Sequence, residues 1–365
     1  FTGTVDATDF NGIPFFTDVA NASMYTHNVS ATDSTAANNT AYGFTAMDAI
    51  TSGDRNTALG WGSGGAILSA TDNTLVGYAA GDALTTGIRN VAIGASALGA
   101  EDAHGYNVAV GYGALQVQNA GANAYNVAVG YEAGKAVTTG VQNTIVGGQA
   151  GDALTTGNYN TALGYIALSS EDAHGLNVAV GAYTLANQNA GANAYNVAVG
   201  YNAGATVTTG IRNTLIGGLA GDALTTGADN VAIGFEALGA EDTGSRNIAM
   251  GYQALKHANY DGNAYNIAIG YGAGTAITTG QLNTLIGGLA GYNLSTGHNN
   301  VAIGMQALES EDAHGKNVAV GAEALQTLNA GADALNVAVG FQAGHLMTTG
   351  VRNTLVGGLA GTALT

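Results

Sequence analysis

Short apolar runs return along the chain at a nearly constant interval, each opened by an asparagine and closed by a glycine. After the asparagine come Val, Thr or Ile, then Ala, Leu or Ile, then a third apolar residue, as in 107–111. β-branched residues in so short a run favour a strand, and each of the frequent glycines would cost a helix about 1 kcal/mol. We therefore predict one short β-strand in each repeat.

The interval between these motif asparagines is 17 residues, and every fourth step from Asn56 onward is 19, so a superunit of 70 residues is copied in tandem. Self-similarity at so short a period is typical of stacked repeats that contact only their neighbours. We predict an all-β fold, a parallel β-solenoid (β-roll) in which each 17- or 19-residue repeat forms one coil. The motif asparagines are Asn39, Asn56, Asn73, Asn90, Asn107, Asn126, Asn143, Asn160, Asn177, Asn196, Asn213, Asn230, Asn247, Asn266, Asn283, Asn300, Asn317, Asn336 and Asn353.

These asparagines are interpreted as structural residues. Stacked side-chain amides can bond to the amides above and below, as in cross-β assemblies. We therefore predict a structural ladder from Asn56 to Asn353, and we assign no catalytic, cofactor-binding or metal-binding residue. Strand side chains alternate between two faces, so three consecutive apolar positions mean that both faces are covered. One face can pack inside the coil, and the other needs a partner.

A second apolar segment follows each predicted strand. Alanine stands seven residues after the motif asparagine in 17 of the 19 repeats, and Leu or Gly comes next. Where that residue is Gly, as at Gly81, a bulky apolar residue such as Leu84 follows three positions later; where it is Leu, as at Leu98, the later position is polar or small. This segment predicts a return strand with one bulky plug per coil, because close packing fixes the interior volume. Turns such as 85–87, Thr-Thr-Gly, would supply a glycine of positive φ.

The repeat divides the chain into two parts. Residues 1–38, with Phe10, Pro14, Phe15, Phe16 and Met24, predict a capping or junction segment, as the ends of solenoids require. Residues 39–365 are the predicted β-roll shaft of 19 coils. The last coil stops part-way through its repeat, which predicts continuation beyond Thr365.

Composition narrows the function further. With 58 glycines the chain still carries 46% hydrophobic residues, so we expect it to order. The net charge of −17 argues against a nucleic-acid partner, whose phosphates need clusters of Lys and Arg, and no apolar run is long enough for membrane insertion. The absence of cysteine excludes disulfides and thiolate metal sites.

Three sets of residues could carry chemistry. The Glu-Asp-Ala-His-Gly turns at 101–105, 171–175 and 311–315 offer metal ligands, but a solvated turn is the favoured interpretation over a weak cation site, and no cofactor is expected. Adjacent carboxylates in near-identical surroundings lack the differing environments that acid/base catalysis needs, so we expect no enzyme.

Thr-Thr pairs at turns are too irregular for an ice-binding face. An aromatic file could stack on sugars, although packing is favoured; it comprises Trp61, Tyr78, Tyr112, Tyr131, Tyr165, Tyr201, Phe235, Tyr252, Tyr271 and Phe341, interrupted by Gly148, Gly218, Gly288 and Gly358.

The runs N-V-A-V-G-Y-x-A-L and N-T-L-I-G-G-L-A-G resemble the head repeats of YadA-type trimeric autotransporter adhesins. Two longer sequence motifs are similar to those of marine cyanophage repeat proteins that act as tail-fibre or structural proteins. They are D-A-L-T-T-G followed by N-V-A-I-G, and N-A-Y-N-V-A-V-G-Y-x-A-G. The likeness covers residues 39–365. It implies a left-handed β-roll and a homotrimer with the second strand face at the common axis. The coils here are longer than those of the adhesins.

From these features we expect a structural fibre segment, of a phage tail fibre involved in host attachment, located in the virion. Its partners would be two sister chains, other tail or surface-fibre proteins and an unidentified host-cell receptor. The alternative is a bacterial trimeric surface adhesin whose head binds a host glycan or matrix protein. A β-helical lyase or hydrolase would need unique carboxylates in a broken repeat, and the sequence shows none.

Overall fold

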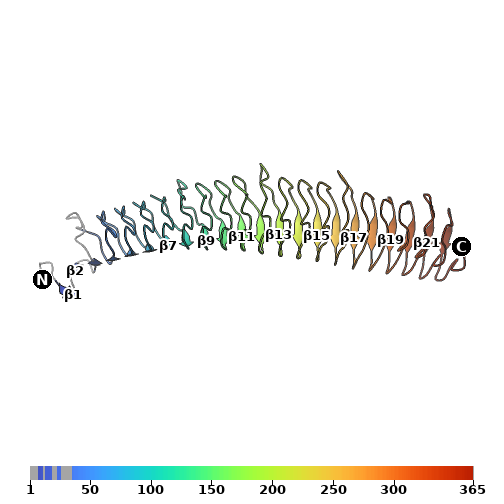
Figure 1. The fold of residues 1–365 in the computed structure, drawn as a ribbon, viewed down its shortest axis with the longest axis horizontal. Coiled ribbons are helices and arrows are strands. Elements are labelled where there is room, and N and C mark those ends of the chain that lie inside the picture. The colour runs from blue at the N-terminus through green and yellow to red at the C-terminus, as the bar shows by residue number, and fades with distance from the viewer. Residues whose placement is uncertain (1–6, 11–12, 19–22, 26–34, 365) are drawn as a thin grey trace. The chain divides into compact units, whose positions relative to one another are not determined.

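The computed structural model describes residues 7–10, 13–18, 23–25 and 35–364, and it divides into two compact units, 1–177 and 178–365 (Figure 1). Each unit is described by itself. Across the described ranges the regular elements are all β-strands, and none is a helix.

In the first unit, β4 to β11 are strands of three residues that begin directly after a motif asparagine. Each pairs in parallel with the next, residue against equivalent residue, as in Thr144↔Thr161 of β10 and β11. Their bounds are β4 Thr40–Tyr42, β5 Thr57–Leu59, β6 Thr74–Val76, β7 Val91–Ile93, β8 Val108–Val110, β9 Val127–Val129, β10 Thr144–Val146 and β11 Thr161–Leu163.

The second unit repeats the arrangement without change. Its strands also pair in parallel between equivalent residues, across both the 17- and the 19-residue steps. The bounds are β12 Val178–Val180, β13 Val197–Val199, β14 Thr214–Ile216, β15 Val231–Ile233, β16 Ile248–Met250, β17 Ile267–Ile269, β18 Thr284–Ile286, β19 Val301–Ile303, β20 Val318–Val320, β21 Val337–Val339 and β22 Thr354–Val356. The predicted parallel β-solenoid is therefore confirmed in both units, while its handedness and trimeric state stay predictions.

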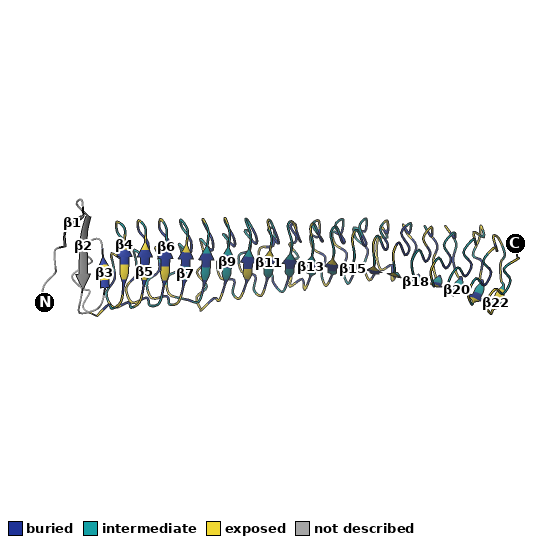
Figure 2. Ribbon diagram, turned by 90° about the horizontal axis from the view of Figure 1, so that it is seen from below, coloured by how far each residue is buried: buried dark blue, intermediate teal, exposed yellow. Residues whose placement is uncertain are grey.

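The core of each coil lies between the strand and the segment that follows it. The central strand residue is buried in β4 to β21, and the alanine seven residues after the motif asparagine is buried with it (Figure 2). Both predicted kinds of plug are completely buried, as at Leu84 and Leu98. Burial of apolar side chains, at roughly 25 cal/mol per Å², supplies the main driving force for stacking the coils.

The predicted return strand is wrong. The second apolar segment is a run of turns in which φ alternates in sign, with Ser96 at 56° and Leu98 at 53° on either side of Ala97. Ser96 N–H donates to the Tyr78 carbonyl of the preceding coil, while Leu98 N–H donates to the Ala114 carbonyl of the following coil. The segment is thus hydrogen-bonded to both neighbours without being extended.

The expectation of one plug per coil is also wrong. In the coils that carry Leu as the plug, the position three residues later is buried as well. Leu325 and Leu328 share one coil, so that later position is neither polar nor small there. The other buried residues at this position are Glu101, Gln118, Glu171, Gln188, Glu241, Ala258 and Glu311.

The Thr-Thr-Gly turns need glycine for a reason other than positive φ. Gly87, Gly140 and Gly157 lie outside the left-handed region. A Cβ atom on Gly87 would lie 2.3 Å from the His104 carbonyl oxygen, and one on Gly157 would lie 2.2 Å from that of His174. The backbone of the next coil fills the space that a side chain would occupy.

The glycine that closes a motif with another coil after it is under both constraints, whereas Gly357 in the last motif has only the positive φ. Gly287 has φ of 134°, and a Cβ atom there would lie 2.4 Å from the Gly304 carbonyl oxygen, which is main chain of the next coil. Only glycine tolerates this backbone conformation without strain. Conversely, the adjacent Gly288 has no atom within 4 Å of its Cβ position.

The N-terminal segment contains β1 (Ala7–Phe10), β2 (Ile13–Asp18) and β3 (Ser23–Tyr25). β1 and β2 pair antiparallel, as do β2 and β3, whereas β3 pairs in parallel with β4. Tyr25 is 2% exposed and in register with Ala41, at the core position of the first coil. The side chains of Phe10, Pro14, Phe15 and Phe16 lie outside the described part, and the capping role of 1–38 stays a prediction.

We predict that Gly287→Ala lowers the free energy of unfolding by at least about 2 kcal/mol, because the new methyl group strains φ and overlaps the Gly304 main chain. The matched control is Gly288→Ala, which should shift stability by less than about 0.5 kcal/mol. Thermal unfolding followed by circular dichroism compares the two variants. Equal midpoints would contradict the close approach of the coils at Gly287.

Candidate functional site

The motif asparagines form a continuous ladder within each unit, and their side chains connect three successive coils. Asn213 is typical: its Oδ1 accepts the main-chain N–H of Asn230 at 3.0 Å, and its Nδ2 donates to the Gly227 carbonyl at 2.9 Å. Its own N–H donates to Oδ1 of Asn196 at 2.8 Å. An amide placed like that of Asn213 therefore satisfies one donor and one acceptor of buried main chain, whereas Nδ2 of Asn107 and of Asn247 is buried without a hydrogen-bond partner.

This geometry differs from a simple stack of amides. Direct bonds from Nδ2 to the preceding Oδ1 occur in some coils, such as Asn73 to Asn56 at 3.0 Å, but the main-chain bonds recur far more regularly. Before two of the four long turns, glutamine supports the ladder: Asn126 Nδ2 donates to Gln118 Oε1 at 2.8 Å, and Asn196 Nδ2 donates to Gln188 Oε1 at 2.6 Å. The ladder is structural in its contacts, and it offers no group to a substrate.

The outer face of the strands is a repeated apolar feature of the described chain. The first and third residues of each strand from β5 to β21 flank the buried central residue and remain partly exposed (Figure 2). The third position, three residues after the motif asparagine, is apolar in all 19 coils, with Tyr42 as its one aromatic member. The first position carries only Val, Ile or Thr. This outer strand face carries no charge, although the net charge of the chain is −17.

The aromatic file lies beside this face, two residues further along each coil. Its rings are exposed and stack on one another from coil to coil: Trp61 and Tyr78 at 4.9 Å, and Tyr252 and Tyr271 at 5.2 Å between centroids. Some rings thus pack on one another, but they stay exposed, so the choice between packing and stacking on sugars is not decided by these contacts. The rings still extend the outer strand face on one side.

A second column, on the residues immediately before the motif asparagines, was missed by the sequence reasoning. Arg55 forms a two-pronged ion pair with Asp72, and Arg212 does the same with Asp229, which lowers the pKa of Asp229 through the guanidinium hydrogen bond. Arg89 donates to the Tyr106 hydroxyl and lies over its ring. Residues 17 positions apart with complementary charge were the available signal. Such exposed pairs contribute little to stability, because solvent screens the charges.

The Glu-Asp turns are not fully solvated, so that expectation is wrong for their glutamates. Glu101, Glu171, Glu241 and Glu311 are completely buried, at the same interior position that holds an apolar plug in other coils. Oε1 of Glu241 accepts the Gly244 N–H at 2.8 Å. Burial raises the pKa of Glu101 and Glu311, and it raises the pKa of Glu241 to about 7.

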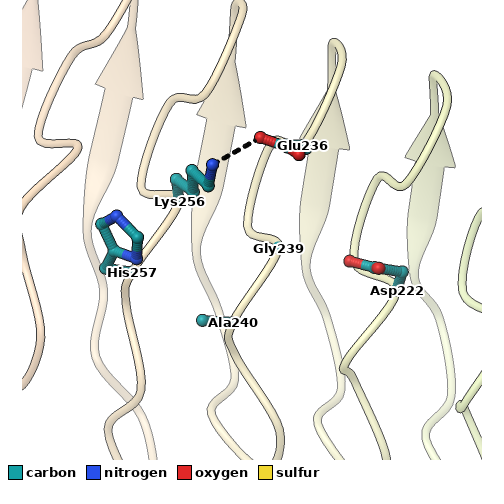
Figure 3. Close-up of a pocket in the computed structure, with 6 residues that line it drawn as sticks. All are labelled: Asp222, Glu236, Gly239, Ala240, Lys256 and His257. Atoms are coloured by element: carbon teal, nitrogen blue, oxygen red, sulfur yellow. Dashed lines mark ion pairs between the residues drawn. The ribbon is translucent and has the colours of Figure 1, made fainter.

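One shallow pocket of the second unit holds opposite charges (Figure 3). Glu236 Oε2 lies 2.6 Å from Lys256 Nζ, and the hydrogen bond from Lys256 lowers the pKa of Glu236. His257 and Asp222 lie beside this pair along the stack of coils (Figure 3). The ion pair with Lys256 therefore engages the Glu236 carboxylate.

Comparison with protein families, curated proteins and solved structures found no match for this chain. In the part of the chain that the structure describes, no helix has the length and apolar character to span a bilayer. The function therefore has to be argued from the coils themselves.

We predict that Asn213→Ala destabilises the second unit by about 2 to 6 kcal/mol, because it leaves the Asn230 N–H and the Gly227 carbonyl buried without their partner. The control Asn293→Ala removes an exposed amide from the same unit and should change stability by less than about 0.5 kcal/mol. Hydrogen exchange at the amide of Asn230 reports the loss directly. Unchanged protection there would contradict the ladder geometry.

We also predict that stability falls as pH rises from 4.5 to about 7, because Glu241 then ionises inside the fold while its pKa in the unfolded chain is near 4.5. The penalty is absent below pH 4.5 and complete above pH 7, where it reaches roughly 3 kcal/mol. Glu241→Gln should therefore raise the unfolding midpoint at pH 8 and change it little at pH 4.5. The exposed Asp261→Asn serves as the control, and an equal gain at both pH values would contradict the burial of this charge.

Proposed function

We propose that this chain is a non-enzymatic structural segment of a fibre, of the phage tail-fibre type that serves host attachment, and that it assembles as a homotrimer. The observation that carries the proposal is the uncharged outer strand face, which runs from coil to coil in each unit. Soluble monomers rarely expose contiguous apolar surface of this kind. Three sister chains would bury it against one another.

The chemistry of the coils suits a mechanical role. Each coil is tied to its neighbours by strand pairing, by the asparagine ladder and by the interior plugs, so the load is shared among many equivalent bonds. The same contacts recur from one coil to the next, and a site of unique residues is not needed for stiffness. The net charge of three chains, each −17, would limit lateral association of finished fibres.

The second candidate is a bacterial trimeric surface adhesin whose head binds a host glycan or matrix protein. The exposed aromatic file favours it, because ring faces such as those of Tyr252 and Tyr271 can stack on sugars. The two functions differ in one measurement. Binding of the purified chain to a glycan array, lost in Tyr271→Ala, would select the adhesin; a silent array selects the structural fibre.

We predict that the purified chain has three times its monomer mass of 36.0 kDa in light scattering. A triple variant carries Ile216→Glu, Ile233→Glu and Met250→Glu at the third strand positions of consecutive coils. It should have the mass of a monomer, because the new charges would face the buried axis of the trimer.

The control for this prediction adds the same charge elsewhere. Ala122→Glu, Ala192→Glu and Ala332→Glu place three carboxylates in the exposed long turns and should leave the trimer intact. Circular dichroism verifies that both triple variants keep the strand signal. A wild-type monomer or dimer, or equal masses for the two variants, would overturn the proposal.

A further inference from the structure

The turns that contain histidine share a feature that neither the ladder nor the outer strand face uses. Each turn brings together one glutamate, one aspartate and one histidine, and one ligand atom from each residue lies within 4.8 Å of the other two. The three groups are Glu101 with Asp102 and His104, Glu171 with Asp172 and His174, and Glu311 with Asp312 and His314. A nitrogen and two carboxylates are therefore gathered in a turn of four residues. The fold repeats this arrangement at the same interior position in three different coils.

In two of these turns, those of Glu101 and Glu311, buried atoms are held in place but lack hydrogen-bond partners. The main-chain N–H of His104 donates to Oε1 of Glu101 at 2.9 Å, which fixes the carboxylate over the turn. The second oxygen, Oε2 of Glu101, is buried without a hydrogen-bond partner, and so is Nδ1 of His104. Oε2 of Glu311 and Nδ1 of His314 are in the same state. Buried polar atoms without a partner are rare and unfavourable, so a missing ligand is indicated.

The spacing of these atoms matches a transition-metal ion. Nδ1 of the histidine lies 3.5, 3.7 and 3.5 Å from Oε1 of the glutamate in the three turns. Two ligand atoms that each lie about 2.0 to 2.1 Å from a tetrahedral zinc ion are separated by about 3.4 Å. The hydrogen bond from the main chain to the glutamate would then act as an outer-shell contact that orients the ligand.

The fourth copy of the turn shows what the histidine adds. Gly244 stands where His104 stands in the first copy, and the Glu241 carboxyl group covers its Cα: a Cβ atom there would lie 2.3 Å from the glutamate Cδ. Without the imidazole, the carboxylate occupies the space beside the turn. The chain thus contains three complete ligand sets and one natural control that folds without the nitrogen ligand.

We propose that each of the three Glu-Asp-Ala-His turns binds one divalent transition-metal ion of the zinc class, through the glutamate, the histidine Nδ1 and the aspartate. The partly exposed imidazole and the exposed Asp172 and Asp312 place the site at the surface end of a buried carboxylate, so water can complete four ligands. The nitrogen ligand and the small donor set favour zinc over calcium or magnesium, which take six or more oxygens. The ion would neutralise a charge that the coil otherwise buries alone.

Equilibrium dialysis of the full chain against Zn²⁺ tests the proposal, after chelator treatment and with the bound metal measured by mass spectrometry. We expect about three ions per chain, and loss of all three in the variant His104→Ala, His174→Ala, His314→Ala. The matched control removes the same number of imidazoles from outside these turns, by His257→Ala, His298→Ala and His345→Ala. It should still bind three zinc ions. Substitution with Co²⁺ should give the visible absorption of a tetrahedral site in the wild type and in the control.

A gain of binding provides the second test. Gly244→His completes the fourth turn: the three atoms nearest to its Cβ position all belong to the carboxyl end of the Glu241 side chain, which must move to admit it, and the variant should bind a fourth ion. Circular dichroism confirms that each variant is folded. The proposal is overturned if the wild type binds no Zn²⁺ at micromolar concentrations, or if removing the turn histidines leaves the stoichiometry unchanged.

Discussion

The close approach of successive coils governs the rest of this structure. In-register pairing of three-residue strands brings main chain so near to main chain that the motif glycine has no room for a Cβ atom, as Gly287 shows against Gly304. The same approach brings every motif asparagine within reach of two other coils. The regular spacing of the motif within this chain is therefore a consequence of backbone contact as much as of apolar packing.

Polar groups inside the coils are tolerated because the repeat supplies partners at a fixed distance. The asparagine ladder bonds its buried amides to main-chain groups of neighbouring coils, as at Asn213, although Nδ2 of Asn107 and of Asn247 lacks such a partner. The glutamates at the plug position are different, since only one of their oxygens is engaged in the turns at 101–104 and 311–314. Burial accordingly raises the pKa of Glu101, Glu241 and Glu311.

Much of the fold could be predicted because strand, glycine and asparagine recur on one period, which leaves a stack of parallel coils as the simplest arrangement. The second segment could not be predicted, because Ser96 and Leu98 adopt positive φ, a conformation that residues other than glycine rarely take. Apolar spacing alone resembles a strand there. The burial of Glu101 was missed for a related reason. A charged residue in a turn is expected to be solvated, and only the neighbouring coils, which the sequence of one turn does not show, bury it.

The aromatic file has a consequence for how copies of the chain would align. Neighbouring coils expose nearly the same strand face, so two chains displaced by one coil would bury almost equal area. The rings do not repeat with that short period: Gly148, Gly218, Gly288 and Gly358 leave a gap every 70 residues, between rings such as Tyr131 and Tyr165. A slip of one coil would set each of these glycine gaps against another residue, and only a displacement of four coils, or a multiple of four, sets gap against gap from Gly148 to Gly358. The 70-residue superunit would therefore determine how copies of the chain align along an otherwise uniform strand face.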